Sequence, residues 1–512
     1  MTADFTPVPP TRTVGSGNPP VDMNNTSLEL AAMGATYNVL DANFSGGADP
    51  SGTNDSTAAI QAALTAIAAN GGGTVLFPPG TYKVSSALTV SGNGVILQGC
   101  GSAILGGSGT TIRTTSATAN VLTLSGTGIT VRDLNVTSSA ATPTAGAAFS
   151  ITGSGVTLDN VAVAYTFNGV YCTGASTVTL KVVNVSQVAG AHCFYFGGVT
   201  GARMILCDAG MTGSYHGANG ITVDGGCSTI QGYNCGALRC AVGLLVENAN
   251  AAGAPSIIYF YDFEADHCYL QGIILGGACT EVKFIGGLVT SSGQSGAGYA
   301  GVDCYDNGGL ASQLMIQGMT VEFSSGDGID LHAAAGGACN TVRLNDVHVA
   351  GNGSSSGGPY YGITVWAASA VTIRGGAVGQ IGGTTSPYQA DGIYLNFGPS
   401  NIRIETVDLR GNLTLPFADG GSTNTRVINC LGYNPVGVVT VSVPATGVAV
   451  AAADYDRTFY VTAAASGTTT MAISAGPTIT VPASACVPVK VPAGQALTPS
   501  YSSAPSWVVE GE

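Results

Sequence analysis

Residues 38–84 read NVLDANFSGGADPSGTNDSTAAIQAALTAIAANGGGTVLFPPGTYKV, and this stretch decides the fold. Its middle, Asn54–Asn70, predicts a helix whose start Asn54 or Asp55 can cap. The apolar residues there recur at helical spacing: Ile60, Ala63, Leu64 and Ile67. One amphipathic helix that is followed only by strands predicts a plug over the open end of a β structure.

Strand and turn signals follow this helix directly. Gly71-Gly72-Gly73 ends it, because glycine adopts the backbone conformations that stop a helix. The runs 74–77 (TVLF) and 81–84 (TYKV) then indicate two strands around a Pro-Pro-Gly turn.

Three motifs in this part of the chain resemble a known family. They are DSTAAIQAAL (55–64), GGGTVLFPPGTY (71–82) and LQGCG (97–101). Together they are similar to the opening segment of the pectate-lyase-like superfamily, in the branch of phage tailspikes and polysaccharide depolymerases. The resemblance is specific over about residues 39–101. It implies a right-handed, single-stranded parallel β-helix and a role with polysaccharides, but it supplies no catalytic residues.

A repeat of about 27 residues indicates the same architecture from the residues themselves. Positions 1, 3, 6 and 8 of each repeat are mostly apolar and position 2 is mostly polar, which is typical of strands with one face inward. The strands are expected to start at Ile129, Val156, Val178, Ala202, Ser228, Ser256, Val282, Leu314, Val342, Val371, Ile402 and Thr425. A second strand recurs as Gly-apolar-x-apolar, for example GVDC (301–304), GIDL (328–331) and GITV (362–365). Such units must stack, because none can bury its apolar face alone.

These patterns divide the chain into three parts. Residues 1–37 are rich in Pro, Gly and Asn and are expected to be an arm or adaptor. The β-helix is expected over 38–434, with a capping segment at 38–101 and regular coils at about 129–433. Residues 435–512 are rich in Val, Thr and Ala and predict a small C-terminal all-β domain, sandwich-like, for trimerisation or glycan contact.

The overall composition narrows the classes of function. The 512 residues carry 15 basic and 29 acidic side chains, a net charge of −14, which disfavours a nucleic-acid partner. No apolar run approaches the ~20 residues of a membrane span, and no signal peptide is visible. We therefore expect synthesis in the cytoplasm and a place in a virion or outside the cell.

Most of the thirteen cysteines are expected to be buried thiols rather than members of disulfides. Five fall on inward strand positions: Cys172, Cys207, Cys235, Cys304 and Cys430. Those of GGC (225–227) and GGAC (276–279 and 336–339) are expected at one interior edge. No metal site or cofactor is predicted, since no paired CxxC occurs with histidine.

Connection lengths predict where a surface trough lies. The connection at 321–328 is short, and it is preceded and followed by the long, Gly/Ser/Tyr-rich stretches 291–301, 351–362 and 379–392. Aromatic side chains suit sugar rings because they pair an apolar face with a polar tip. The candidate substrate-binding residues are Tyr299, Tyr305, Tyr360, Tyr361, Trp366, Tyr388 and Tyr394, together with His332.

Acidic residues are expected on the floor of this trough. Asp303 and Asp330 take the same outward position on successive coils, about 4.8 Å apart, and Glu322 and Asp327 lie near them in sequence. Two close carboxylates raise one pKa, which yields an acid beside a base or nucleophile. A separation of ~5–5.5 Å suits a retaining glycosidase; Glu322 with Asp303, or Glu264 with Glu322 two coils away, suits an inverting one. The alternative is that these acids are merely solvated, or that Asp327 only makes a turn.

A secondary candidate site gathers acids from earlier repeats: Asp224, Glu247, Glu264, Asp266 and His267. A lyase would instead need a basic residue near the acids, for which Arg343, Arg374 and Arg403 are available.

We therefore expect a phage-type tailspike or depolymerase, a homotrimer that binds and hydrolyses a bacterial surface polysaccharide. Residues 1–37 are a possible attachment to a virion baseplate or tail protein. The alternatives are a receptor-binding tail fibre without enzymatic activity and a polysaccharide lyase.

Overall fold

The computed structural model describes residues 35–102, 109–211, 217–250, 252–276, 279–305, 312–332, 340–353, 359–379, 388–433, 438–439, 441–453 and 456–511. The arm predicted for residues 1–37 lies outside these ranges except for its last three residues, and so does Cys339. Of Tyr305 only the backbone is described.

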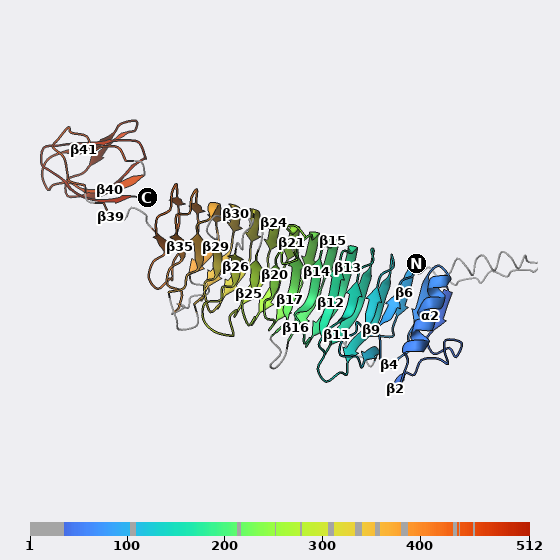
Figure 1. Ribbon diagram of the computed structural model, residues 1–512. Coiled ribbons are helices and arrows are strands. Elements are labelled where there is room, and N and C mark those ends of the chain that lie inside the picture. The colour runs from blue at the N-terminus through green and yellow to red at the C-terminus, as the bar shows by residue number, and fades with distance from the viewer. Residues whose placement is uncertain are drawn as a thin grey trace, which may run out of the picture.

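The main body is an all-β parallel β-helix, as predicted (Figure 1). One sheet, the thirteen-stranded sheet, takes one strand from each coil: β5 (Leu88–Val90), β8 (Leu122–Leu124), β10 (Ala147–Ile151), β12 (Asn168–Thr173), β14 (His192–Gly197), β17 (Asn219–Asp224), β20 (Leu244–Val246), β23 (Ile273–Leu275), β26 (Val302–Tyr305), β29 (Ile329–His332), β32 (Ile363–Trp366), β35 (Ile393–Asn396) and β37 (Phe417–Asp419). It collects the predicted Gly-apolar-x-apolar motifs, and their apolar positions face the core.

The remaining strands of the coils form the twenty-five-stranded sheet: β1 (Ala35–Asn38), β2 (Ser51–Asp55), β3 (Gly73–Leu76), β4 (Gly80–Val84), β6 (Val95–Gln98), β7 (Thr110–Thr114), β9 (Thr130–Ser138), β11 (Thr157–Ala164), β13 (Ser176–Ser186), β15 (Thr200–Ile205), β16 (Asp208–Gly210), β18 (Ser228–Tyr233), β19 (Gly236–Leu238), β21 (Ser256–Tyr261), β22 (Glu264–Asp266), β24 (Thr280–Ile285), β25 (Leu288–Thr290), β27 (Ser312–Gln317), β28 (Thr320–Glu322), β30 (Asn340–Asn345), β31 (His348–Ala350), β33 (Ser369–Arg374), β34 (Ala377–Gly379), β36 (Arg403–Glu405) and β38 (Arg426–Ile428).

A bend divides the two strands that most coils contribute to this second sheet. The residue at the bend has a left-handed backbone, for example Leu206 (φ 53°), Asn234 (φ 48°) and Asp262 (φ 51°), and glycine takes the place in Gly286 (φ 71°). The inward residues are at positions 1 and 3 of the repeat before the bend and at positions 6 and 8 after it. The bend therefore explains why the apolar positions change from odd to even.

The predicted plug is α2 (Thr57–Ala69), which packs on β1, β3 and β5 at the N-terminal end of the β-helix. All four apolar residues predicted for its inner face are buried. Its Gln61 also covers an open edge: the side-chain amide accepts from the Thr89 N–H (2.9 Å) and donates to the Thr89 carbonyl (3.1 Å). Thr89 lies in β5, the first strand of the thirteen-stranded sheet, so Gln61 occupies backbone groups that another strand could pair with.

The start of α2 differs from the prediction. Asn54 and Asp55 end β2, and the residue before the helix is Ser56, whose side chain makes no capping hydrogen bond. Its hydroxyl accepts instead from the Asp49 N–H (2.9 Å), because the preceding loop folds back on it.

The strand register also corrects two repeats. Ala202 pairs with Ile230, and Ile230 pairs with Ile258, so these coils start at Ile230 and Ile258 rather than at Ser228 and Ser256. The serines lie two residues earlier in the same strands, where period-two alternation makes a shift of two residues invisible in the sequence.

The interior is a single apolar core that runs the length of the coils. All five cysteines predicted on inward strand positions are buried, as are Cys227 and Cys279 at the corner. The twelve described cysteines are free thiols.

The C-terminal residues form a small antiparallel module with its own core, centred on Phe459 and Met471. One sheet holds β39 (Val438–Val439), β40 (Arg457–Thr462), β43 (Cys486–Val491) and β45 (Ser506–Gly511); the other holds β41 (Thr469–Ile473), β42 (Thr478–Val481) and β44 (Leu497–Tyr501). Across the described chain, no helix is long and apolar enough to cross a membrane.

Candidate functional site

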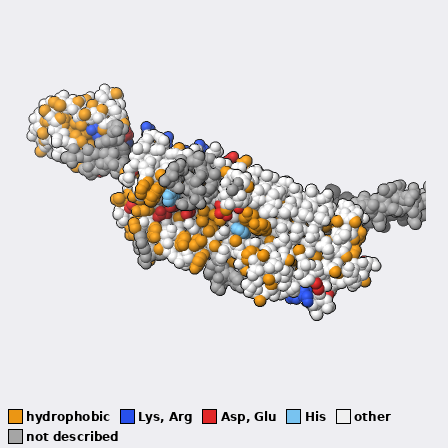
Figure 2. Space-filling model, in the orientation of Figure 1, with side chains coloured by type: hydrophobic (Ala, Val, Ile, Leu, Met, Phe, Trp, Pro, Cys, Tyr) orange, Lys and Arg blue, Asp and Glu red, His pale blue; other side chains and the backbone are white. Residues whose placement is uncertain are grey.

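The outer face of the thirteen-stranded sheet brings the central acids together. Asp303 in β26 and Asp330 in β29 are direct register partners on neighbouring parallel strands, which lie about 4.8 Å apart. Figure 2 shows acidic side chains and a histidine among hydrophobic side chains on this face, over the strands labelled β26 and β29 in Figure 1.

Asp327 is the third member of this group, which we call the Asp303 cluster (Asp303, Asp327 and Asp330). It precedes β29, and its carboxylate accepts from the Tyr361 N–H (2.7 Å) and from the Thr364 hydroxyl (2.6 Å). These bonds cross to the next coil, so Asp327 does more than make a turn. Asp303 accepts one hydrogen bond, from the side-chain amide of Gln271 (2.9 Å).

Burial raises the pKa of all three carboxyl groups, and repulsion from neighbouring carboxylates adds to the rise at Asp327 and Asp330. The pKa of Asp330 is raised to about 8 by burial and then by the charges of Asp327 and Asp303. Burial raises the pKa of Asp327 to about 6 against the effect of its two hydrogen bonds, and burial raises the pKa of Asp303. The Asp330 Oδ1 atom is buried without a hydrogen-bond partner among the described residues, which favours the neutral acid.

The glycine at the start of each Gly-apolar-x-apolar motif leaves space for side chains that pack behind the acidic strands. A Cβ on Gly328 would lie 2.3 Å from the Val349 side chain and 2.6 Å from the amide nitrogen of Asn352. Asn352 is fully buried at the corner between the sheets; it bonds the Val321 carbonyl (3.3 Å) and the side chain of Gln389 (3.3 Å). The glycine of each motif therefore leaves room for a buried polar ladder behind the acids.

The short connection that was predicted to form the floor of a surface trough is not accessible, because neighbouring connections cover it. Ser324, Ser325 and Gly326 of the short connection are buried, because the long connections fold against them from both sides. Ser325 N–H donates to Ser292 (2.9 Å), and Gly353 N–H donates to the carbonyls of Ser324 and Gly326 (both 2.8 Å). The accessible surface is therefore the outer face of the sheet beside this corner.

Aromatic rings form a row next to the acids. The rings of His332 and Trp366 stack with centroids 5.0 Å apart, and those of Trp366 and Phe397 stack at 4.1 Å. Phe397 is 63% exposed although it is large and apolar. We call this row of three rings the aromatic ladder (His332, Trp366 and Phe397). Beside it, the rings of Tyr361 and Tyr394 pair with their centroids 4.5 Å apart.

The other predicted tyrosines lie on the connections rather than on the sheet face. Tyr299 and Tyr360 are half-buried, and Tyr388 is 49% exposed. Tyr360 forms a bridge with Gln389, so it belongs to the cover over the short connection.

Glu322 stands apart from the Asp303 cluster. It ends β28 in the other sheet, and burial alone raises its pKa, with no contribution from the three aspartates. In the strand register, Glu322 pairs with Thr290, and Thr290 pairs with Asp266, so the residue aligned with Glu322 two coils earlier is Asp266. Glu264 is aligned with Thr320 instead. The misassigned register of the 256 repeat accounts for this difference.

The secondary candidate site is split between the two sheets. Asp224 and Glu247 lie on the thirteen-stranded sheet and form a second acidic group, the Asp224 cluster. Glu264 and Asp266 belong to β22 of the other sheet, and His267 follows them and contacts Asp266 (2.5 Å). Beside the Asp224 cluster, Tyr171 and Tyr195 stack at 4.3 Å, and His192 bonds Thr222 (2.9 Å).

The sequence reasoning missed four residues of this face. Thr364 was visible as the polar residue of GITV, at the position that aspartate takes in GVDC and GIDL. Phe397 was visible as an aromatic residue at a strand end, as Trp366 is. Gln271 and Asp391 gave no such signal; Asp391 is buried, accepts from the Leu415 N–H (3.0 Å) and has a pKa raised by burial.

The basic residues available to a lyase lie elsewhere. Arg343, Arg374 and Arg403 belong to β30, β33 and β36 of the twenty-five-stranded sheet, and Arg403 pairs with Glu405. None of them contributes to the pKa shifts of the Asp303 cluster.

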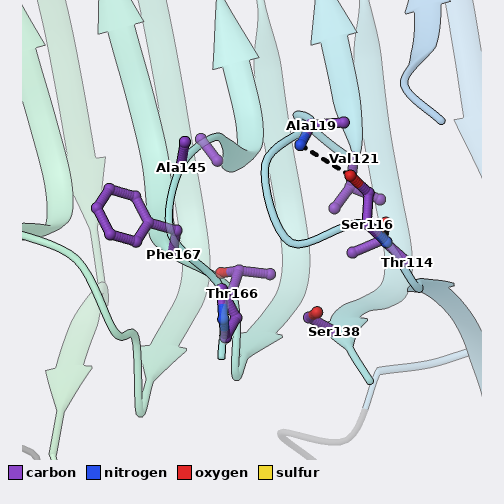
Figure 3. A pocket seen from close by; sticks show the side chains of 10 residues that line it. Thr114, Ser116, Ala119, Val121, Ser138, Ala145, Thr166 and Phe167 are labelled. Carbon is purple, nitrogen blue, oxygen red and sulfur yellow. Dashed lines mark hydrogen bonds between the residues drawn. The ribbon is translucent and has the colours of Figure 1, made fainter. Parts of the chain in front are cut away.

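A separate small, open pocket lies nearer the N-terminal end of the β-helix (Figure 3). Its walls include Thr114, Val121 and Phe167, and the Ser116 hydroxyl accepts from the Ala119 N–H (3.0 Å). The residues that line it carry no carboxylate, imidazole, amine or thiol, so it offers no group for acid–base chemistry.

Comparisons with known proteins agree with this fold. Residues 37–253 match the family model "Rhamnogalacturonase A/epimerase, pectate lyase-like". No curated protein matches the chain.

Among solved structures, the tailspike protein of E. coli bacteriophage HK620 in complex with pentasaccharide is similar at a TM-score of 0.53 and 13% identity, over 95% of this chain and 94% of that one. Tailspike protein 3 of bacteriophage CBA120 is similar at a TM-score of 0.54 and 15% identity, over 84% of this chain and 66% of that one. At such identities the likeness establishes the fold. The opening segment is thus pectate-lyase-like, as its motifs predict, and the chain has the parallel β-helix fold that this superfamily shares with phage tailspikes.

Proposed function

We propose that this protein binds a polysaccharide along the outer face of the thirteen-stranded sheet and hydrolyses it with the Asp303–Asp330 pair. The observation that carries the proposal is the register of these two half-buried aspartates on neighbouring strands. The aromatic ladder beside them, in which Phe397 is exposed and the other two rings are half-buried, offers flat apolar surfaces for sugar rings.

Asp330 serves as the general acid. A pKa near 8 keeps its carboxyl group protonated at neutral pH, so it can give its proton to the glycosidic oxygen as the bond to the leaving sugar breaks. Its buried Oδ1 atom has no hydrogen-bond partner among the described residues, which helps to keep the carboxyl group protonated.

Asp303 serves as the nucleophile. Burial raises its pKa, but the hydrogen bond from Gln271 and the charge of His332 both oppose that rise and favour the ionised form. Strands about 4.8 Å apart place the carboxyl groups near the ~5–5.5 Å separation of retaining enzymes. Asp303 then attacks the anomeric carbon, and water releases the glycosyl ester with Asp330 as the base.

Asp327 acts as a positioning residue. Its two hydrogen bonds fix it to the next coil, and its negative charge raises the pKa of Asp330. It therefore keeps the acid protonated without contacting the reacting atoms.

We extend the proposal to a tailspike of the depolymerase type that acts as a homotrimer on a bacterial surface polysaccharide. The likeness to two phage tailspikes, one of them in complex with a pentasaccharide, supports this extension. Residues 1–37 would join it to a virion, and the C-terminal module would serve trimerisation or glycan contact.

A binding-only fibre is the second candidate, because the aromatic ladder supports glycan binding whether or not cleavage follows. A lyase has less support, since no Lys or Arg contributes to the pKa shifts of the Asp303 cluster.

Product analysis separates these functions. The full chain is incubated with host polysaccharide, and reducing ends and ultraviolet absorbance are measured together. New reducing ends without absorbance support hydrolysis, and absorbance of an unsaturated product indicates a lyase. Binding without cleavage supports the fibre. Full cleavage by the double variant Asp303→Asn/Asp330→Asn would refute the assigned pair.

A further inference from the structure

The two sheets of the β-helix differ completely in their basic residues. The strands of the thirteen-stranded sheet contain no Lys or Arg at all, whereas the strands of the twenty-five-stranded sheet contain ten of the fifteen in the chain. The ten are Lys83, Arg113, Arg132, Lys181, Arg203, Lys283, Arg343, Arg374, Arg403 and Arg426.

Carboxyl groups, unlike Lys and Arg, occur on the strands of both sheets, and on the thirteen-stranded sheet no Lys or Arg of its own strands offsets them. Its strands carry Asp224, Asp303, Asp330 and Asp419, and Glu247, Asp327 and Asp391 lie at strand ends. The outward positions between the two acidic clusters are apolar, with Leu245 and Ile274 in the register column of Asp303.

Histidine is the one potential cation on these strands. Burial lowers the pKa of His192 to about 4, so it is neutral at pH 7. His332 stacks on Trp366 at the aromatic ladder. At the corners between the sheets, Arg239 is exposed and Arg410 pairs with Asp408 (2.6 Å).

We infer that the glycan held on this face carries no carboxylate where it meets the Asp303 cluster, so the substrate is a neutral or amino-sugar polymer and not a uronic-acid polysaccharide. The inference rests on the proposed function and names its substrate class. Carboxylates are normally bound by Arg or Lys side chains or by several free N–H groups. Here there are no such side chains, and the backbone N–H groups of inner strands serve the parallel ladder.

Repulsion strengthens this argument. A uronate beside ionised Asp303 and Asp327 would place like charges within a few ångströms on a partly water-excluded face, where the interaction is stronger than in bulk water. A hydroxyl group or an ammonium group instead finds acceptors in the same carboxylates.

A matched pair of polymers tests the inference. An acidic bacterial polysaccharide is compared with the same polymer after chemical reduction of its uronates to neutral sugars, and a panel of neutral and amino-sugar polysaccharides is added. Binding is measured by affinity electrophoresis at low salt, where screening is weakest. We expect the reduced polymer to bind about tenfold or more tightly than its parent.

Variants locate the binding. Trp366→Ala should remove binding of the neutral polymer, and Tyr233→Ala, from a ring stack on the other sheet, should not. Acidic-polymer binding that survives Trp366→Ala and is lost in Arg343→Gln/Arg374→Gln belongs to the other sheet and supports the charge separation.

The outcomes separate this inference from the proposed function. The inference is overturned if the acidic polymer binds through Trp366 at least as tightly as its reduced form does. The same conclusion holds if this binding of the acidic polymer is abolished by His332→Gln or Arg239→Gln. Binding of neutral polymers without cleavage leaves the inference standing and refutes hydrolysis. If no polymer binds through Trp366, both are refuted.

Discussion

The Asp224 and Asp303 clusters occupy the same outer face, three strands apart, yet their carboxyl groups have different surroundings. Both oxygens of Asp224 are satisfied: they accept from the Tyr195 hydroxyl (2.8 Å), the Gly225 N–H (2.6 Å) and the Asn250 N–H (3.2 Å). Asp330 has one buried oxygen with no partner among the described residues. Burial alone therefore does not make an acid catalyst; the missing hydrogen bonds do.

The largest contrast is expected in cleavage. Asp330→Asn removes the proton donor, and general acid catalysis typically contributes about 10²–10⁴-fold, so kcat should fall by that factor. Asp224→Asn should leave kcat within about twofold, because the Asp224 carboxylate is already bonded to Tyr195 of the preceding coil and to Asn250 of the following one. Equal losses of kcat in both variants would mean that the two clusters do not differ in role.

The second contrast concerns stability against pH. The folded-state pKa of Asp330 is raised to about 8 from an ordinary value of 3.8, so the folded state loses stability as the pH rises between these values. Each pH unit in that window costs up to ~1.4 kcal/mol, and the loss ends above pH 8. Urea unfolding of the wild type and of Asp330→Asn, measured from pH 4 to pH 9, checks this. A wild type whose pH dependence matches that of the variant would contradict the raised pKa.

The same titration limits activity. In the proposed mechanism Asp330 acts in its protonated form, so the rate of cleavage should fall as the pH rises above about 8. Replacing Asp327 by Asn removes a charge that raises this pKa, so the alkaline limb should move to lower pH. An unchanged limb would show that Asp327 does not act through Asp330.

A smaller effect is expected from the satisfied cluster. Asp224→Asn places an amide among three donors, and loss of a buried charge-assisted hydrogen bond costs ~1–3 kcal/mol in free energy of unfolding. Urea unfolding at pH 7 measures it, with Glu264→Gln, at an exposed strand position of the other sheet, as the control. A loss no greater than that of the control would show that the bonds of Asp224 add no stability.

The smallest effect is expected from a single ring. Phe397→Ala removes one stacking surface and should weaken glycan binding by ~0.5–1.5 kcal/mol, with kcat unchanged. Affinity electrophoresis measures the change, and Tyr261→Ala, from the ring pair on the other sheet, is the matched control. Equal losses in both variants would argue against a binding role for the aromatic ladder.

Much of the fold was predictable because it depends on repetition. The motifs at 55–101 predicted the β-helix and its capping helix, and the GVDC and GIDL motifs predicted that Asp303 and Asp330 would be neighbours. Period two could not distinguish Ser256 from Ile258 as a strand start, so the pairing of Glu322 was misassigned. The connection lengths located the corner, but they did not reveal that the long connections cover the short one.

The sequence by itself determined the parallel coils, the helix that closes their N-terminal end and the alignment of the two aspartates, because each follows from spacing along the chain. Only the tertiary structure decided which acids are satisfied and which are not. Hydrogen-bond partners such as Tyr195 for Asp224, or Tyr361 and Thr364 for Asp327, come from neighbouring coils some 30 residues away. It also placed every Lys and Arg of the coil strands on one sheet, a separation that the net charge of −14 conceals.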